Sequence, residues 1–367
     1  MKAVKANEVI NVMEEWAPEA WAFDWDNVGL QVGSKNKQVS RVMITLDVLE
    51  NVVDEAIQKD VDLIIAHHPL LFVKPSSINT DEAKGRVLQK LLTHDITVYA
   101  SHTNLDIAVG GVNDVLAEAI GLDYTKPFVA NFQENVYKVA VHVPVDYAER
   151  LRSAISEAGA GHLGDYSHCT FQIAGEGTFK PLDGASPFLG KEGELEKVKE
   201  LKVETIVKEK ELNAVIDAIH ASHPYEEPAY DIYQIEIDGE NRGLGRIGQL
   251  EKKSSLQALV EKVKTAYQVP VVRVTGEADK KVKTVAVVGG SGEDFFKAAK
   301  AKGADVLITG DVTFHKAQEA LEMGLSIIDP GHHVEKLICS TIKEKIENEL
   351  KVEVMLSESD TEPFRFQ

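Results

Sequence analysis

The sequence predicts an α/β protein in which a duplicated βα unit forms one two-lobed domain, with a ferredoxin-like α+β domain inserted in it. In the opening third, short β-branched runs alternate with amphipathic stretches, a pattern typical of a parallel sheet with crossover helices. The last third repeats this order of elements. The middle segment instead reads β-α-β-β-α-β, the order of ferredoxin-like domains.

In the opening third, hydrophobic periodicity predicts three strands and four helices. The strands are expected at 42–46, 63–66 and 97–100. The helices are expected at 7–16, 50–59, 81–94 and 112–120. The pair Asn79 and Thr80 is expected to cap the third helix, since side-chain oxygens there can accept backbone N–H bonds.

The duplication can be followed residue by residue. Segments 41–69 and 283–312 both run strand, helix, acid, strand, so that Asp62 aligns with Asp305 and His68 with Asp311. Segment 96–106 aligns more loosely with 325–335. The outer thirds are therefore expected to be two related halves of one fold.

The inserted segment is expected to span about 132–240, leaving 1–131 and 241–367 as the two lobes. Its strands are expected at 137–143, 167–173, 175–179, 203–207 and 230–237, and its helices at 147–158 and 212–220. The Pro/Gly-rich stretch 180–194 would be its long loop.

Composition excludes several classes of protein. With 59 acidic and 40 basic residues the formal net charge is -19, which disfavours nucleic acid as a partner. No uninterrupted apolar stretch approaches the roughly 20 residues of a membrane span. Cys169 and Cys339 lie far apart and form no C-x-x-C motif, which favours a reducing compartment. A cytoplasmic location is therefore expected.

Three clusters of histidine and carboxylate follow predicted strands. They are IIAHHPLLF (64–72), SHTNLD (101–106) and GHHVE (331–335). In open parallel sheets ligands bind beyond the carboxyl ends of the strands, so the clusters would converge if the two halves face each other. An isolated His-His pair is common on protein surfaces, so the joint placement carries the inference. Imidazole with carboxylate suits Zn, Fe, Mn, Co or Ni.

Together with WDNVGLQVG (25–33) and TGD (309–311), these motifs resemble the NIF-three-like family (NGG-one-interacting factor three), whose members are also called GTP cyclohydrolase 1 type 2 homologues. The resemblance implies two divalent metal ions per chain, with Asp106 bridging them. The implied ligands are His67, His68, Asp106, His332 and Glu335. His333 could replace His332 by a small shift in register.

The segment HPYEEPAYDIYQ (223–234) resembles the PII/CutA-like domain that some bacterial members of the family carry. The resemblance implies that the insert trimerises and that the chain assembles into a homohexameric toroid. HPYEEP also has two readings of its own, a metal site through His223, Glu226 and Glu227 or a shaped turn. VVGGSGEDFF (287–296) is likewise either an anion-binding loop or a tight glycine turn.

A two-metal site is typical of hydrolases, so the sequence favours a metal-dependent hydrolase acting on a small nucleotide or phosphorylated substrate. His102 and Asp311 are the candidate acid–base groups, and the alternative for each is a hydrogen bond that orients a ligand. A rival hypothesis is a regulatory or metal-handling protein in which the CutA-like insert senses or gates access to the metal site.

Overall fold

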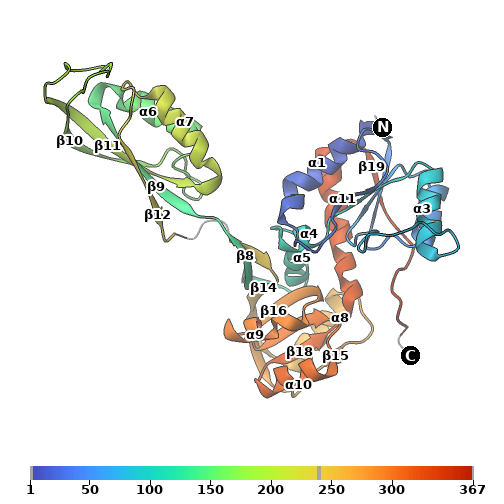
Figure 1. The fold of residues 1–367 in the computed structure, drawn as a ribbon. Helices are drawn as coiled ribbons and strands as arrows, with labels where there is room; N and C mark the ends of the chain where they lie inside the picture. Colours follow the sequence, from blue (N-terminus) through green and yellow to red (C-terminus); the bar gives the residue numbers. More distant parts are fainter. Residues whose placement is uncertain (1–2, 238–240, 366–367) are drawn as a thin grey trace. The chain divides into compact units, whose positions relative to one another are not determined.

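The computed structural model describes residues 3–237 and 241–365. The chain forms two compact units, Met1–Asn131 with Arg242–Gln367, and Phe132–Asn241. The second unit covers the segment expected as an insertion. The first unit consists of two lobes, each built on a sheet that is largely parallel at its centre (Figure 1).

The sheet of the first lobe has the strand order β19-β4-β5-β6-β2. Its strands are β2 (Gly29–Val32), β4 (Arg41–Thr45), β5 (Leu63–Ala66), β6 (Thr97–Ala100) and β19 (Glu353–Leu356). β4, β5, β6 and β19 are parallel, and β2 is the antiparallel edge. The parallel sheet predicted from the opening third is therefore present, and the last strand of the chain completes it.

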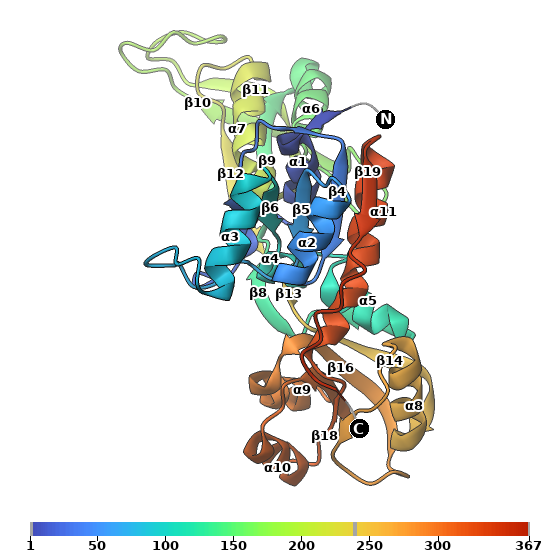
Figure 2. The same cartoon turned by 90° about the vertical axis from the view of Figure 1, so that its right-hand side faces the viewer.

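Helices cover both faces of this sheet, as Figure 2 shows. They are α1 (Ala6–Trp16), α2 (Glu50–Gln58), α3 (Ala83–Thr93) and α11 (Ile338–Glu349). In β4, Val42 and Ile44 pack in the same core as α1 and α11, whereas Met43 packs with α2 and α3. This alternation follows from the two-residue period of a strand.

The sheet of the second lobe has the order β15-β18-β17-β16-β14-β7. Its strands are β7 (Leu122–Lys126), β14 (Arg246–Ser255), β15 (Arg273–Val274), β16 (Lys281–Ser291), β17 (Val306–Gly310) and β18 (Ser326–Asp329). β16, β17 and β18 are parallel, with antiparallel strands on either side. One face packs against α8 (Leu256–Ala266), and the other against α9 (Phe296–Ala301) and α10 (Phe314–Glu322) (Figure 2).

Asp62 and Asp305 hold equivalent positions in the two lobes. Asp62 Oδ2 accepts hydrogen bonds from the backbone N–H groups of Ser40 and Arg41, at 2.7 and 3.0 Å. Asp305 Oδ2 accepts from Lys283 and Thr284, at 2.8 and 3.0 Å. Each aspartate directly precedes the second of two parallel strands and, through its carboxylate, binds backbone N–H groups near the start of the first. This equivalence is the one that the sequence alignment of the two segments predicts.

The two lobes share one hydrophobic core. Leu116 of α5 (Val112–Ala119) packs in it with Leu256 of the second lobe and Ile342 of α11. The remaining short elements of the first unit are β1 (Val4–Lys5), β3 (Gln38–Val39), α4 (Thr103–Ile107) and the 3-10 helices Glu19–Trp21, Glu293–Phe295 and His332–Leu337. β8 (Val129–Gln133) and β13 (Asn241–Leu244) lie where the chain passes between the units.

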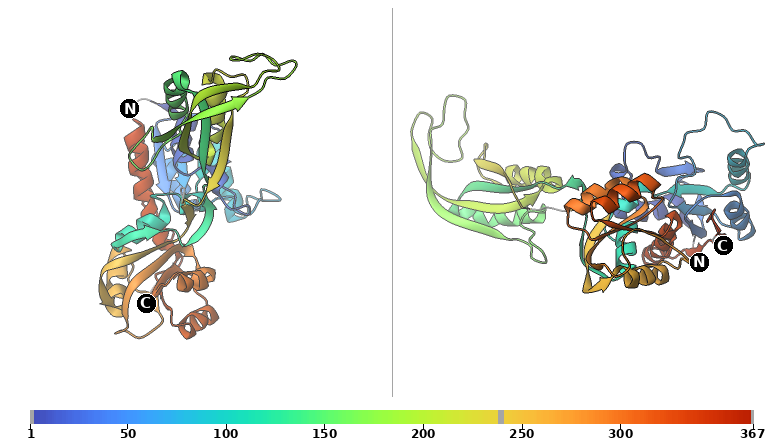
Figure 3. Two further views of the ribbon diagram at one scale, coloured as in Figure 1. Left: turned by 90° about the vertical axis from the view of Figure 1, so that its left-hand side faces the viewer. Right: turned by 90° about the horizontal axis from the view of Figure 1, so that it is seen from below.

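The second unit is ferredoxin-like by its own topology. The chain runs β9 (Val136–Pro144), α6 (Ala148–Glu157), β10 (Thr170–Phe179), β11 (Glu196–Lys208), α7 (Leu212–Ser222) and β12 (Tyr230–Ile235). Short 3-10 helices at Val145–Tyr147 and Glu209–Glu211 precede the two helices. The sheet is antiparallel in the order β10-β11-β9-β12, and both helices pack on one face (Figure 3). A long loop joins β10 to β11, as expected from the Pro/Gly-rich stretch.

Two local predictions were wrong. Strands 167–173 and 175–179 are one continuous strand, β10, because Gly175 stays in register opposite Glu200 of β11. Helix α3 begins at Ala83 rather than 81, and Asn79 does not cap it. Asn79 Oδ1 instead accepts from the N–H of Asp81 at 3.1 Å, closing a turn ahead of the helix.

Among the residues that the structure describes, none of the helices is both long and apolar enough to cross a bilayer.

Candidate metal centre

The three histidine and carboxylate clusters lie at the carboxyl ends of parallel strands, as predicted. His67 and His68 directly follow β5. After β6, His102 directly precedes α4, and Asp106 lies within that helix. His332 and Glu335 lie in the 3-10 helix that follows β18. A 3-10 helix has three residues per turn, so these last two side chains project from the same face.

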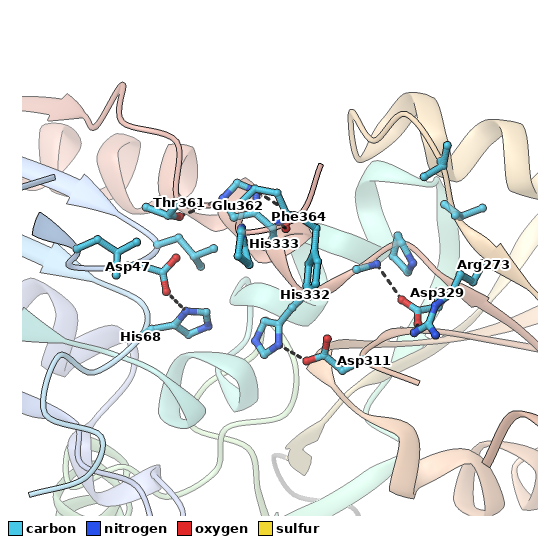
Figure 4. A pocket seen from close by; sticks show the side chains of 17 residues that line it. Asp47, His68, Arg273, Asp311, Asp329, His332, His333, Thr361, Glu362 and Phe364 are labelled. Atoms are coloured by element: carbon cyan, nitrogen blue, oxygen red, sulfur yellow. Dashed lines mark hydrogen bonds and ion pairs between the residues drawn. The ribbon is translucent and has the colours of Figure 1, made fainter. Parts of the chain in front are cut away.

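Each of the three predicted histidine ligands has its Nδ1 atom held by a hydrogen bond. The partners are Ser101 O for His67 at 2.9 Å, Asp47 Oδ1 for His68 at 2.7 Å and Asp311 Oδ2 for His332 at 2.7 Å. Figure 4 shows the last two pairs. A backbone carbonyl can only accept, so His67 carries a proton on Nδ1, which leaves Nε2 as the nitrogen that can bind a metal ion. Such outer partners are typical of metal-ligating histidines, since they fix the ring and its tautomer.

The Nε2 atoms of these histidines converge on Glu335. Their distances to Glu335 Oε2 are 3.8 Å for His67, 3.0 Å for His68 and 3.2 Å for His332. Asp106 Oδ1 lies 3.7 Å from His67 Nε2, and both side chains are buried. The structure therefore brings all five predicted ligands together.

The donor atoms also fit a metal ion by a second criterion. Within the described part of the chain, His67 Nε2 and Asp106 Oδ1 are buried and have no hydrogen-bond partner. Buried polar atoms are rarely left without one, because burial costs them their hydrogen bonds to water. A cation between them would satisfy both atoms.

Three overlapping groups of side chains could each hold an ion, with all candidate donor atoms of a group within 4.8 Å of one another. The groups are His67 with His68 and His102, His68 with His332 and Glu335, and His67 with Asp106 and Glu335. Three residues belong to two groups each, which is the arrangement that a shared, multinuclear site needs.

His102 belongs to the first group, although the sequence suggested an acid–base role for it. Its Nδ1 lies 3.0 Å from both carboxylate oxygens of Asp26. Burial raises the pKa of Asp26, but hydrogen bonds from His102 and Thr103 outweigh it and lower the pKa to about 2. Asp26 is thus a carboxylate that fixes His102 as Asp47 fixes His68.

The carboxyl groups and imidazoles shift one another's proton affinity. Burial raises the pKa of Asp106 to about 6. Burial acts in the same direction on Glu335, but hydrogen bonds to the surrounding imidazoles, His332 first, hold its pKa well below the usual value. The bond to Glu335 raises the pKa of His332 to about 9. For His68, burial lowers the pKa, yet Asp47 and Glu335 raise it to about 10.

This geometry bears on two questions that the sequence left open, which of the adjacent histidines faces the centre and how the glycine-rich segment 287–296 is arranged. His333 points away from the donor cluster, and its Nε2 lies 3.1 Å from Thr361 Oγ1, so His332 is the histidine at the centre (Figure 4). The glycines of β16 lie within the strand, at a register shift between Val287 and Ser291, and they pack closely against the centre. A Cβ on Gly289 would lie 2.8 Å from Glu335 Oε1, and one on Gly290 would lie 3.1 Å from His332 Nε2.

The sequence analysis missed Asp26, Asp47 and Ser101. Asp47 could have been found, because it follows β4 at the same sheet edge as the histidine clusters. Asp26 lies in WDNVGLQVG, far from His102 in sequence, and Ser101 contributes only its backbone carbonyl. No residue pattern in the sequence predicts that Asp26 or Ser101 forms these hydrogen bonds.

A cavity of about 920 Å³ opens beside the centre, and His68, Asp311 and His332 lie on its wall. Apolar side chains form much of the rest, namely Leu46, Leu49, Val271, Val272 and Phe364. Arg273 also lines the cavity, with its side chain largely exposed and paired with Asp329. The C-terminal residues 361–364 form one side of it (Figure 4).

Comparison with known proteins gives matches along the whole chain. The model of the Duf34/NIF3 (NGG1p interacting factor 3) family matches residues 4–363. A Bacillus subtilis protein named GTP cyclohydrolase 1 type 2 homolog is 48% identical, covering 100% of this chain and 99% of its own. The crystal structure of a Bacillus cereus protein related to NIF3 has a TM-score of 0.85 and 45% identity over 100% of both chains. Reduced HcgD from Methanocaldococcus jannaschii, at 23% identity and a TM-score of 0.60 over 98% of this chain, shares the fold.

Proposed function

Because the chain belongs to the Duf34/NIF3 family, we propose that it is a dinuclear-metal-dependent hydrolase acting on a small nucleotide or phosphorylated molecule. One observation carries the proposal: three histidine Nε2 atoms converge on the buried carboxylate of Glu335. One of them, His67 Nε2, is buried beside Asp106 Oδ1, and neither atom has a hydrogen-bond partner among the described residues. The name of the Bacillus subtilis relative points to guanine nucleotides, but a name is a weak warrant for a reaction.

The residues of the centre have different proposed roles. His67, His68, Asp106, His332 and Glu335 would hold two divalent ions, and His67, His68 and Glu335 each belong to two of the candidate groups. His102 lies within the same donor distances, so the geometry favours a ligand role for it over acid–base work. Asp311 holds Nδ1 of His332 from the exposed side and orients that ring. Two bound ions would polarise a substrate oxygen and lower the pKa of a water molecule, which is the chemistry of hydrolysis.

The adjoining cavity supports an enzyme rather than a metal store. Its volume lies within the usual range for small-molecule sites, about 300 to 1,000 Å³. Its apolar wall suits a flat ring such as a nucleobase, and Arg273 supplies a guanidinium for an anionic group. A site that only stores or delivers an ion needs no such space next to its ligands, which argues against the metal-handling hypothesis.

Screening metal-loaded protein against nucleotides and phosphoesters, with chelated protein beside it, tests the proposal. We expect hydrolysis that requires metal and is abolished in Glu335→Gln, while Glu251→Gln, an exposed acid of the same unit, keeps full activity. Activity that survives both chelation and Glu335→Gln would sink the assignment.

A further inference from the structure

The second unit contains a cavity of its own, of about 570 Å³. It lies between the start of the β10–β11 loop, the β11 strand and the turn that carries HPYEEP. Four aromatic side chains line it, and the ring of Tyr225 has its centroid 5.5 Å from that of Phe179 and 6.4 Å from that of Phe188. Tyr230 lies on the wall as well.

Glu200 is a buried carboxylate on the wall of this cavity, with only 8% of its surface exposed. Its Oε1 accepts one hydrogen bond, from the Tyr225 hydroxyl at 3.1 Å. Among the described residues, this is the one hydrogen bond to the Glu200 carboxylate, and no Lys, Arg or His nitrogen forms an ion pair with it. Burying a carboxylate without a cation is costly, and a neutral hydroxyl offsets only part of that cost.

His223, the nearest candidate for a counter-ion, is neutral. Its Nδ1 accepts the backbone N–H of Tyr225 at 3.0 Å, so that nitrogen carries no proton. Its Nε2 donates to the carbonyl of His142 at 2.9 Å. Burial also lowers the pKa of His223. These two bonds use both ring nitrogens, which favours the shaped-turn reading of HPYEEP over a metal site.

The rim of the cavity adds negative charge. Glu226, Glu227 and Asp231 line it, whereas among the described residues Lys180 is the one Lys or Arg on its wall. A negative, aromatic cavity with one deeply placed carboxylate attracts a cation that also has apolar surface, through charge pairing and cation–π contact.

We propose that this cavity binds a small organic cation, an amine whose ammonium group pairs with Glu200 and whose apolar body lies against Phe179, Phe188 and Tyr225. The site is separate from the candidate metal centre and does not depend on the function proposed for it. It gives the inserted unit a ligand of defined chemistry.

Benzylamine, a cation at neutral pH, is a suitable probe, and benzyl alcohol is its neutral counterpart of the same shape. We expect saturation-transfer NMR on the intact protein to detect benzylamine and to give at least tenfold weaker binding for the alcohol. Glu200→Gln should weaken benzylamine at least tenfold and remove the preference for it over the alcohol. Glu157→Gln, which removes an exposed acid from the same unit, should bind like the unaltered protein.

Variants at Tyr225 separate the ring from the hydroxyl. Tyr225→Phe should stay within about threefold of the unaltered protein, whereas Tyr225→Leu should lose binding, because only the latter removes the aromatic face. Thermal unfolding and metal content of every variant report on the fold. Equal binding of amine and alcohol, full binding in Glu200→Gln, or no detectable binding of benzylamine would each overturn the proposal.

Discussion

At the scale of single residues, the variant Asp106→Ala tests whether the centre holds two ions. The family resemblance makes Asp106 the ligand shared by two ions, so Asp106→Ala would remove that ligand and leave two cations to repel each other. We expect metal content to fall to one ion or none per chain, measured by elemental analysis. Asp279→Ala, at an exposed position, should retain the full content. Full occupancy in Asp106→Ala would refute the dinuclear site.

His102 and Asp311 are distinguished by the same measurement. If His102 is a ligand, His102→Ala removes one donor atom, and elemental analysis should show fewer ions per chain than in the unaltered protein. Asp311→Ala should retain most of the metal, since Asp311 touches only the outer nitrogen of His332. Loss of metal from Asp311→Ala with none from His102→Ala would exchange the two roles.

Metal binding should be coupled to proton release. Without metal, His68 and His332 carry pKa values of about 10 and about 9, so both are protonated at neutral pH. A ligating imidazole must be neutral, and therefore affinity should rise as pH increases toward about 9. Calorimetry in buffers of different ionisation enthalpy measures the released protons. An uptake of protons, or none exchanged, would contradict this reading of the two histidines.

At the scale of elements, the glycines near the end of β16 leave room for the side chains of the centre. Gly290 has φ +56°, and a Cβ there would lie 2.9 Å from Glu335 Oε1. Gly303 has φ +86° with nothing within 4 Å of its Cβ position, so Gly303→Ala imposes similar backbone strain, about 1 to 2 kcal/mol, without a clash. We expect Gly290→Ala to lose metal and Gly303→Ala to keep it, at similar thermal stability. Equal metal content in the two variants would show that the site does not need a glycine at position 290.

The C-terminal tail, which walls the main cavity, is anchored to α2 through Glu55. The Glu55 carboxylate accepts bonds from Ser357 Oγ at 2.8 Å, Glu358 N–H at 2.9 Å and Ser359 N–H at 3.0 Å. Glu55→Gln should raise hydrogen exchange of 357–364 about tenfold, the effect of losing roughly 1.5 kcal/mol of charged hydrogen bonding. Glu347→Gln, on the surface of α11, serves as the control.

The same anchor should respond to acid. Burial raises the pKa of Glu55, but the hydrogen bonds from the tail and from Lys59 lower it from 4.5 to about 2. A lowered folded-state pKa means that the stabilisation is complete above pH about 4.5 and is lost as pH falls toward about 2. Exchange of the tail in metal-free protein should therefore increase over that window, and a tail that loosens only above neutral pH would contradict it.

At the scale of the whole molecule, residues 132–240 should be separable. Their core is their own, made by β9, β11, α6 and α7, and that of the outer thirds contains none of their residues. Deleting the segment and joining its ends by a short linker should leave a folded protein that still binds metal. An insoluble, metal-free product would count against an insertion.

Assembly gives a second test at this scale. If the insert trimerises as CutA-like domains do, the intact protein should be a hexamer and the deletion variant a smaller species. Light scattering on both decides the question, and equal subunit counts would eliminate the insert as the cause of assembly.

The sequence by itself determined several local features: the strands β4, β5 and β6, the parallel order of the outer thirds, and the placement of His67, His68 and His332 after strand ends. These follow from hydrophobic period and from the rule that parallel strands end at one edge of a sheet. Even the equivalence of Asp62 and Asp305 is visible there, because the two segments keep the same spacing.

Only the tertiary structure decided which side chains meet. Asp26 orients His102, Asp47 orients His68, and His332 rather than His333 faces the centre, since each outcome depends on contacts between segments far apart in the chain. The continuity of β10 likewise rests on pairing with β11, which overrides the local weakness of a glycine in a strand. Local sequence determines the type of each element, and contacts with distant segments determine where the element ends and which side chains meet.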